Sequence, residues 1–252
     1  MSNQQTVVLL DGGMGQELIK RSANAPTPLW SATVMRDEPD LVTTVHADYI
    51  QADARVITLN NYSATPVRLA KHGLSTAFSE LHQAAITAAQ RAIAQTKPTH
   101  PVAVAGCLPP LVSSYHAEDV PSEAACLADY RALVAAQKDG VNLFLCETLT
   151  TVREVQTAAT AGKESGHPVW VGMTVDDQDG TRLRSGESLA DGVAAAKACG
   201  AAAVLINCSW PEAITQGLPI LAASGLPFGG YANGFTNAAS LAAGSTVAGL
   251  AV

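Results

Sequence analysis

Polar side chains that could do chemistry follow several short apolar runs of this chain. The clearest run, Ala202–Ile206, ends in Asn207 and Cys208 before a Ser-Trp-Pro break. This pattern is typical of a buried strand whose last residues carry an amide and a thiol out of the core. A thiol in that position is a metal ligand, a nucleophile or a small core residue.

Two carboxylates occupy comparable positions. Asp11 ends the first apolar run of the chain, and Glu147 ends the run 141–147. A carboxylate at the end of a buried strand needs a partner, because an unpaired buried charge is costly. The ammonium group of a ligand would supply that partner. The alternatives are a structural salt bridge and an N-cap of the following helix.

Strand alternation predicts which of these side chains share a face. Glu147 falls on one face with Leu145, while Cys146 falls on the other. If Glu147 points into the centre of the fold, Cys146 points toward the surrounding helices. By the same rule Cys208 shares its face with Ile206.

Apolar runs alternate with Ala-rich helical patterns along the whole chain. The runs are 6–11, 55–60, 101–106, 141–147, 168–174, 202–208 and 226–230, and the helical patterns are 39–53, 76–96, 122–139, 151–165, 188–199 and 211–223. We expect capping before Pro39, from Asp37-Glu38, and a capping box at Thr151. Alternation of this kind predicts parallel strands with helices outside, in one domain over residues 1–252. Seven strands favour a (β/α)₈ TIM barrel, with a doubly wound sheet as the alternative.

Composition and residue placement exclude several functions. The net charge is −7 and the basic residues are scattered, which does not favour a nucleic-acid or membrane partner. No Lys ends a strand and the six His are isolated, so a Schiff-base aldolase and a His-rich metal hydrolase are not favoured. The five Cys form no CxxC pair and read as reduced thiols of a soluble, cytoplasmic protein.

Taken together and in order, the strand ends resemble the homocysteine S-methyltransferase family. The matching stretches are Leu-Asp-Gly-Gly-Met-Gly at 10–15, Leu-Trp-Ser at 29–31, Val-His-Ala-Asp-Tyr at 45–49, Val-Ile-Thr-Leu-Asn-Asn-Tyr at 56–62, Glu-Thr at 147–148 and Ile-Asn-Cys at 206–208. The resemblance covers nearly the whole chain. It implies a zinc-dependent (β/α)₈ barrel that transfers a methyl group from a small donor to the thiolate of homocysteine, giving methionine.

The resemblance also implies roles for individual residues. Cys208 would be a Zn²⁺ ligand, and Glu147 and Asp11 would hold the amino group of homocysteine. The remaining substrate-binding positions are Met14, Thr58, Asn60 and Asn207. Tyr62 and Tyr231 are pocket candidates or packing residues. Zn²⁺ favours thiolates and keeps an open position in catalytic sites, where it would deprotonate the substrate thiol. The size of the chain favours a small donor such as S-methylmethionine.

One departure from the family concerns the metal. Two further zinc-binding Cys of the family lie in a Gly-Gly-Cys-Cys at the eighth strand, and this sequence contains no such motif. We therefore expect a barrel without its eighth strand and helix in the printed chain, with Cys107 and Cys208 as an alternative thiol pair. The competing hypotheses are a metal-free barrel that pairs with other copies over an open edge, and a barrel enzyme using Asp11 and Glu147 as an acid–base pair.

Overall fold

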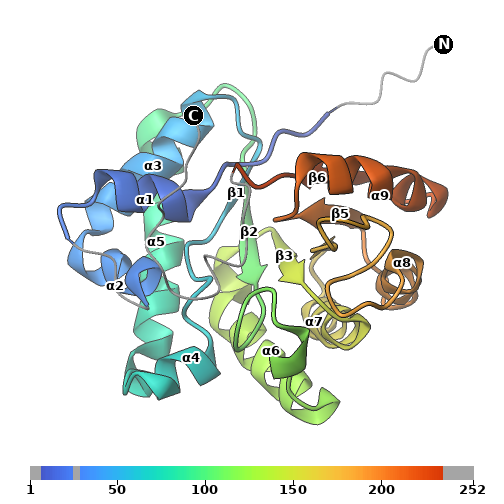
Figure 1. Ribbon diagram of the computed structural model, residues 1–252. Helices are drawn as coiled ribbons and strands as arrows, with labels where there is room; N and C mark the ends of the chain where they lie inside the picture. The colour runs from blue at the N-terminus through green and yellow to red at the C-terminus, as the bar shows by residue number, and fades with distance from the viewer. Residues whose placement is uncertain (1–6, 25–28, 235–252) are drawn as a thin grey trace.

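A parallel sheet forms the centre of the molecule. The computed structural model describes residues 7–24 and 29–234, and this part contains six strands in sequence order (Figure 1). The strands are β1 (Val56–Thr58), β2 (Ala103–Leu108), β3 (Leu143–Leu149), β4 (Val169–Met173), β5 (Ala203–Asn207) and β6 (Phe228–Tyr231). Ahead of β1, Leu10 forms a parallel bridge with Val56. All seven predicted extended segments thus lie side by side.

Helices cover the outside of this sheet (Figure 1). The predicted ones are α3 (Pro39–Gln51), α5 (Phe78–Thr96), α6 (Glu123–Gln137), α7 (Val152–Glu164), α8 (Leu189–Ala198) and α9 (Pro211–Ala223). The sequence patterns missed α1 (Met14–Arg21), α2 (Trp30–Asp37) and α4 (Pro66–Lys71), and the single 3₁₀ turns η1 (Ser75–Ala77), η2 (Ala117–Asp119) and η3 (Lys138–Gly140). The missed helices have six to eight residues, too few for a clear apolar period.

The strand order excludes the doubly wound alternative. In a doubly wound sheet the order reverses at a switch point. Here each strand pairs with the next from β1 to β6, so successive crossovers move in one direction and the sheet curls like part of a barrel wall. The expectation that the printed chain lacks the eighth strand and helix of the barrel concerns residues 235–252, which lie outside the described residues.

Two apolar layers hold the sheet in place. Alternate strand residues, including Ala105, Leu145 and Leu205, form a small cluster on the concave side. Their neighbours, including Phe144 and Cys146, join the large core between strands and helices. The predicted orientation of Cys146 toward the helices is therefore confirmed.

The predicted helix starts are borne out in part. Thr151 and Glu154 form the reciprocal capping box at the beginning of α7. Pro39 occupies the first turn of α3, but the preceding Glu38 makes no side-chain cap. Its carboxylate instead accepts hydrogen bonds from Ser22 and Asn24, at 2.5 and 2.8 Å. The prediction that Asp37-Glu38 caps α3 was wrong, because this carboxylate is occupied by the segment after α1.

Among the helices of the described residues, none is both long and apolar enough to cross a lipid bilayer.

Candidate functional site

Glu147 lies at the carboxyl end of β3, where it is partly buried. The Sγ of Cys107 donates to its Oε1 at 2.8 Å, and the hydroxyl of Tyr231 donates to its Oε2 at 3.3 Å. Burial raises the pKa of Glu147, while these two hydrogen bonds act in the opposite direction. The predicted pocket residues Glu147 and Tyr231 thus come together with Cys107, on the ends of β3, β6 and β2.

Asp11 reaches the same region from the segment ahead of β1. Its Oδ2 accepts from the backbone N–H of Thr58 at 2.6 Å, and its Oδ1 accepts from the Thr58 hydroxyl at 3.2 Å. Burial raises the pKa of Asp11 to about 7, and the charge of Glu147 adds to this effect. The charge of Glu147 therefore acts on Asp11, and Thr58 orients the Asp11 carboxylate.

The end of β3 is distorted beside Glu147. The pairing of β3 with β4 changes register between Cys146 and Leu149, and Thr148 adopts a left-handed backbone with φ of 62°. The buried side chain of Asn207 stabilises this distortion. Its Oδ1 accepts from the N–H of Thr148 at 2.9 Å, and its Nδ2 donates to the Thr148 hydroxyl at 2.9 Å. Asn207 is thus a structural bridge between β5 and β3.

Cys208 follows β5 directly, with φ of 52°. Its Sγ lies 3.4 Å from the Thr148 hydroxyl and 3.3 Å from Nδ2 of Asn207, both of which donate to it. Strand alternation predicted that Cys208 shares a face with Ile206, which packs toward the helices. That prediction was wrong, because the left-handed backbone ends the alternation and turns the thiol toward Thr148.

Burial raises the pKa of the Cys208 thiol to about 11, against hydrogen bonds from Thr148, Tyr115 and Asn207. Tyr115, in the loop between β2 and α6, also has a left-handed backbone, with φ of 70°. Non-glycine residues rarely adopt this conformation, and such strain concentrates at functional sites. Two residues with left-handed backbone, Tyr115 and Thr148, thus contact the sulfur of a third, Cys208.

Two stacked arginine–tyrosine pairs flank this group, and sequence reasoning missed most of their members. The guanidinium of Arg68 lies 5.1 Å from the ring centroid of Tyr62, and that of Arg184 lies 4.8 Å from the ring of Tyr115. The hydroxyl of Tyr62 bonds to Ser114 at 2.7 Å. Both arginines and Ser114 come from loops or first helical turns, where no periodic pattern marks them.

Two other predicted site residues, Met14 and Asn60, lie in the segments that follow Asp11 and Thr58. Met14 is the first residue of α1, is partly buried and packs against the large core. Asn60 is buried two residues after the end of β1. The assignment of Met14 and Asn60 to the pocket stays a prediction.

The fit of a metal ion to these residues is incomplete. No group of three His, Cys, Asp or Glu side chains suited to a metal occurs within residues 7–24 and 29–234. Residues 1–6, 25–28 and 235–252 of the printed sequence contain none of these four residue types. Cys208 provides one thiol, and the Cys107 thiol is already bonded to Glu147. The residues present therefore supply part of a thiolate site.

Comparison with known proteins identifies the family of this chain. The model of the homocysteine S-methyltransferase family matches residues 8–247. A homocysteine S-methyltransferase from Escherichia coli (strain K12) is 33% identical over 235 residues, which cover 86% of this chain and 74% of that protein. A selenocysteine Se-methyltransferase from Brassica oleracea var. italica is 29% identical, over 82% of this chain and 66% of that protein.

Solved structures agree with the sequence comparison. The metallated form of the homocysteine methyltransferase MmuM from Escherichia coli superposes with a TM-score of 0.77 at 28% identity, covering 96% of this chain and 97% of that chain. Its oxidized form gives a TM-score of 0.78 with the same identity and coverage. By the extent of the family match and the identity to its relatives, this chain belongs to the homocysteine S-methyltransferase family.

Proposed function

We propose that this protein, as a single domain, transfers a methyl group from a small donor to the sulfur of homocysteine, giving methionine. The observation that carries the proposal is the arrangement of Glu147 and Asp11 beside a thiol-bearing strand end, in a chain of this family. Two neighbouring carboxylates suit the ammonium group of an amino acid, and in this proposal the substrate sulfur is activated beside Cys208.

In this proposal Glu147 and Asp11 bind the substrate ammonium group. Burial raises the pKa values of both carboxyl groups. A bound ammonium would favour their charged forms, since an opposite charge nearby lowers the pKa of a carboxyl. Thr58 orients Asp11 through two hydrogen bonds, and Tyr231 orients Glu147. Met14, Asn60 and Asn207 complete the proposed lining.

We propose Zn²⁺ as the cofactor, with Cys208 as a ligand. A zinc ion would supply Lewis acidity that keeps the substrate sulfur deprotonated at neutral pH. The residues present supply only part of such a site, and the roles proposed for the other residues do not depend on the ion. The residues of this chain bind and orient the amino acid, and Thr148 and Asn207 hold the Cys208 sulfur in place.

For the donor we propose S-methylmethionine or a similar small sulfonium compound. A positively charged leaving group departs as a neutral thioether, so the thiolate attacks the methyl carbon without building up new charge. The Tyr62 and Tyr115 rings near Cys208 provide aromatic surface suited to a sulfonium, because cations are attracted to aromatic faces.

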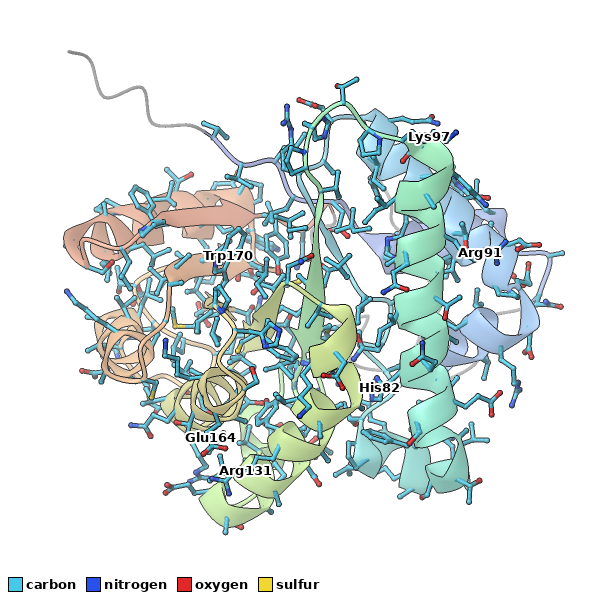
Figure 2. The ribbon with its side chains drawn as sticks, turned by 180° about the vertical axis from the view of Figure 1, so that it is seen from behind. His82, Arg91, Lys97, Arg131, Glu164 and Trp170 are labelled. Atoms are coloured by element: carbon cyan, nitrogen blue, oxygen red, sulfur yellow. The ribbon has the colours of Figure 1, made fainter. Side chains whose placement is uncertain are left out.

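A methyl-transfer assay tests the proposal. With homocysteine, S-methylmethionine and added Zn²⁺, we expect methionine formation by the 252-residue chain. Glu147→Gln should raise the KM for homocysteine by about 10- to 100-fold, since hydrogen bonds to charged groups contribute about 1.5–3 kcal/mol. Glu164→Gln is the matched control, because Glu164 pairs with Arg131 on the outer helices (Figure 2). Equal KM values in the two variants would contradict the assignment of Glu147.

A second reaction class has one observation in its favour. The pKa of Asp11, raised to about 7 by burial, suits a general acid–base catalyst at neutral pH. In that case Asp11 and Glu147 would move protons on a substrate that has no thiol. Activity on such a substrate that survives a strong zinc chelator, and is lost in Asp11→Asn, would favour this reaction over methyl transfer.

A further inference from the structure

Arg68 differs from the other arginine at the strand ends in how its charge is balanced. Arg184 forms an ion pair with Asp177 at 3.0 Å. Within the part of the chain that the structure describes, no carboxylate lies within ion-pair distance of the partly buried Arg68. A guanidinium keeps its charge at all ordinary pH values, so the positive charge of Arg68 stands without a paired anion.

Neutral acceptors fix the position of Arg68. Its Nε donates to the carbonyl of Val112 at 2.9 Å, its Nη1 to the carbonyl of Tyr62 at 3.1 Å, and its Nη2 to the Ser114 hydroxyl at 3.5 Å. These contacts use three of the five N–H groups of a guanidinium. The side chain is thus pre-oriented, with donor capacity left over, as a binding residue for an anion needs.

The guanidinium also lies toward the candidate site. It stacks on the ring of Tyr62, whose hydroxyl is bonded to Ser114. Burial raises the pKa of the Cys107 thiol and the Glu147 charge adds to this, while Arg68 acts in the opposite direction. Arg68 therefore acts electrostatically on the same strand ends that carry Cys107 and Glu147.

We propose that Arg68 binds the carboxylate of an amino-acid ligand at this site. The inference rests on the proposed function, in which both homocysteine and S-methylmethionine are amino acids. Glu147 and Asp11 then bind an ammonium group at one side of the strand ends, and Arg68 binds a carboxylate at another. Planar guanidinium and carboxylate groups form strong, charge-assisted hydrogen bonds. The carboxylate belongs to the acceptor or to the donor, and kinetics distinguishes them.

The first test measures binding without turnover. The probes are L-methionine and L-methioninol, which differ in the carboxylate, and the readout is calorimetric Kd. The unmodified protein should bind methionine about 10- to 100-fold more tightly than methioninol, and Arg68→Gln should reduce that ratio to within about threefold of unity. Because each ratio is taken within one protein, a small loop shift in the variant does not change the conclusion.

Arg153→Gln is the matched control. Arg153 also donates to two backbone carbonyls, of Val120 and Pro121, but it lies on the surface between α6 and α7. It should leave the methionine-to-methioninol ratio unchanged. An equal ratio in the Arg68→Gln variant and the unmodified protein would overturn the proposal. So would an unmodified protein that binds neither probe.

The second test identifies the source of the carboxylate. Arg68→Gln should raise the KM of one substrate, homocysteine or S-methylmethionine, by about 10- to 100-fold with kcat nearly unchanged, and Arg68→Lys should recover part of the loss. The substrate whose KM rises carries the bound carboxylate. Two unchanged KM values would overturn the proposal. A protein that shows the methionine preference but no methyl transfer would instead reject the proposed function and retain the role of Arg68.

Discussion

At the scale of single residues, the amide of Asn207 connects two strands and the Cys208 thiol. It accepts from the N–H of Thr148, donates to the Thr148 hydroxyl, and donates to the Sγ of Cys208. Asn207 and Thr148 are both buried, so water cannot readily replace these bonds. Asn207→Ala should therefore lower the free energy of unfolding by about 2 kcal/mol, the usual cost of a buried donor left without an acceptor. Urea denaturation measures this loss.

Asn142→Ala is the matched control for this prediction. The side chain of Asn142 also accepts from a backbone N–H, that of Val104 at 2.8 Å, but Asn142 is exposed. Water replaces the lost acceptor there, and the variant should lose less than about 0.5 kcal/mol. Similar losses in both variants would mean that the Asn207 amide does not stabilise the left-handed turn of Thr148.

The carboxyl of Asp11 should make stability fall as the pH rises. Its pKa is about 7 in the folded protein, because of burial, against an ordinary value of 3.8. The folded state therefore binds more protons than the unfolded state between these values, and stability decreases from about pH 4 to pH 7. Asp11→Asn should remove this contribution, on the order of 1–2 kcal/mol at pH 8 after allowing for partial exposure.

The measurement is the free energy of unfolding of Asp11→Asn and the unmodified protein at pH 5 and pH 8. The amide still has an oxygen to accept from Thr58, so the hydrogen bond itself is retained. The gap between the two proteins should widen in favour of the variant at pH 8. A gap that is the same at both pH values would contradict the raised pKa. Bound homocysteine should reduce the gap, since its ammonium group stabilises the charged carboxylate.

At the scale of elements, the sequence predicts the strands and long helices well and the site loops poorly. Continuous apolar runs located β1 to β6 and the segment at Leu10, because strands covered on both sides need apolar residues throughout. Period-two alternation placed Glu147 and Cys146 correctly. It failed at Cys208, because alternation assumes extended backbone and this residue is left-handed. Arg68 and Tyr115 were missed because their roles depend on contacts between loops that are distant in sequence.

The interface of α3 and α5 should make the protein sensitive to acid. His46 on α3 and His82 on α5 are both fully buried, and His82 lies on the side of α5 away from Arg91 (Figure 2). Burial lowers the pKa of His46 to about 4, and neither of its ring nitrogens has a hydrogen-bond partner within the described residues. The unfolded state therefore binds more protons below pH 6.5, and stability is lost as the pH falls toward 4.

His46→Leu tests this effect through the slope of stability against pH. Between pH 7 and pH 4 the unmodified protein should lose about 3 kcal/mol more than the variant, corresponding to a shift of about 2.5 pKa units. Chemical denaturation at several pH values gives both slopes. His72→Leu is a suitable comparison, because His72 is an exposed residue after α4 and should leave the slope unchanged. Parallel slopes for His46→Leu and the unmodified protein would contradict the prediction.

At the scale of the whole molecule, the position of each cysteine limits the metal chemistry of the chain. Cys146 packs toward the helices, and Cys126 is buried within α6. Cys199 follows α8, outside the strand ends. Only Cys107 and Cys208 lie at the strand ends that carry the candidate site, and Cys107 is bonded to Glu147. Three of the five cysteines are therefore packing residues, and Cys107 and Cys208 remain as candidate metal ligands.

The zinc content of the 252-residue chain follows from this sorting. A catalytic zinc site usually has three protein ligands, and one or two thiolates hold the ion much less tightly. We expect zinc added in excess to be removed by dialysis against EDTA, leaving well below one ion per chain by plasma mass spectrometry. Cys208→Ser should abolish the zinc retained without chelator, whereas Cys126→Ser should not. One chelator-resistant zinc per chain that is lost in both Cys208→Ser and Cys107→Ser would instead mean that Cys107 and Glu147 separate to complete the site.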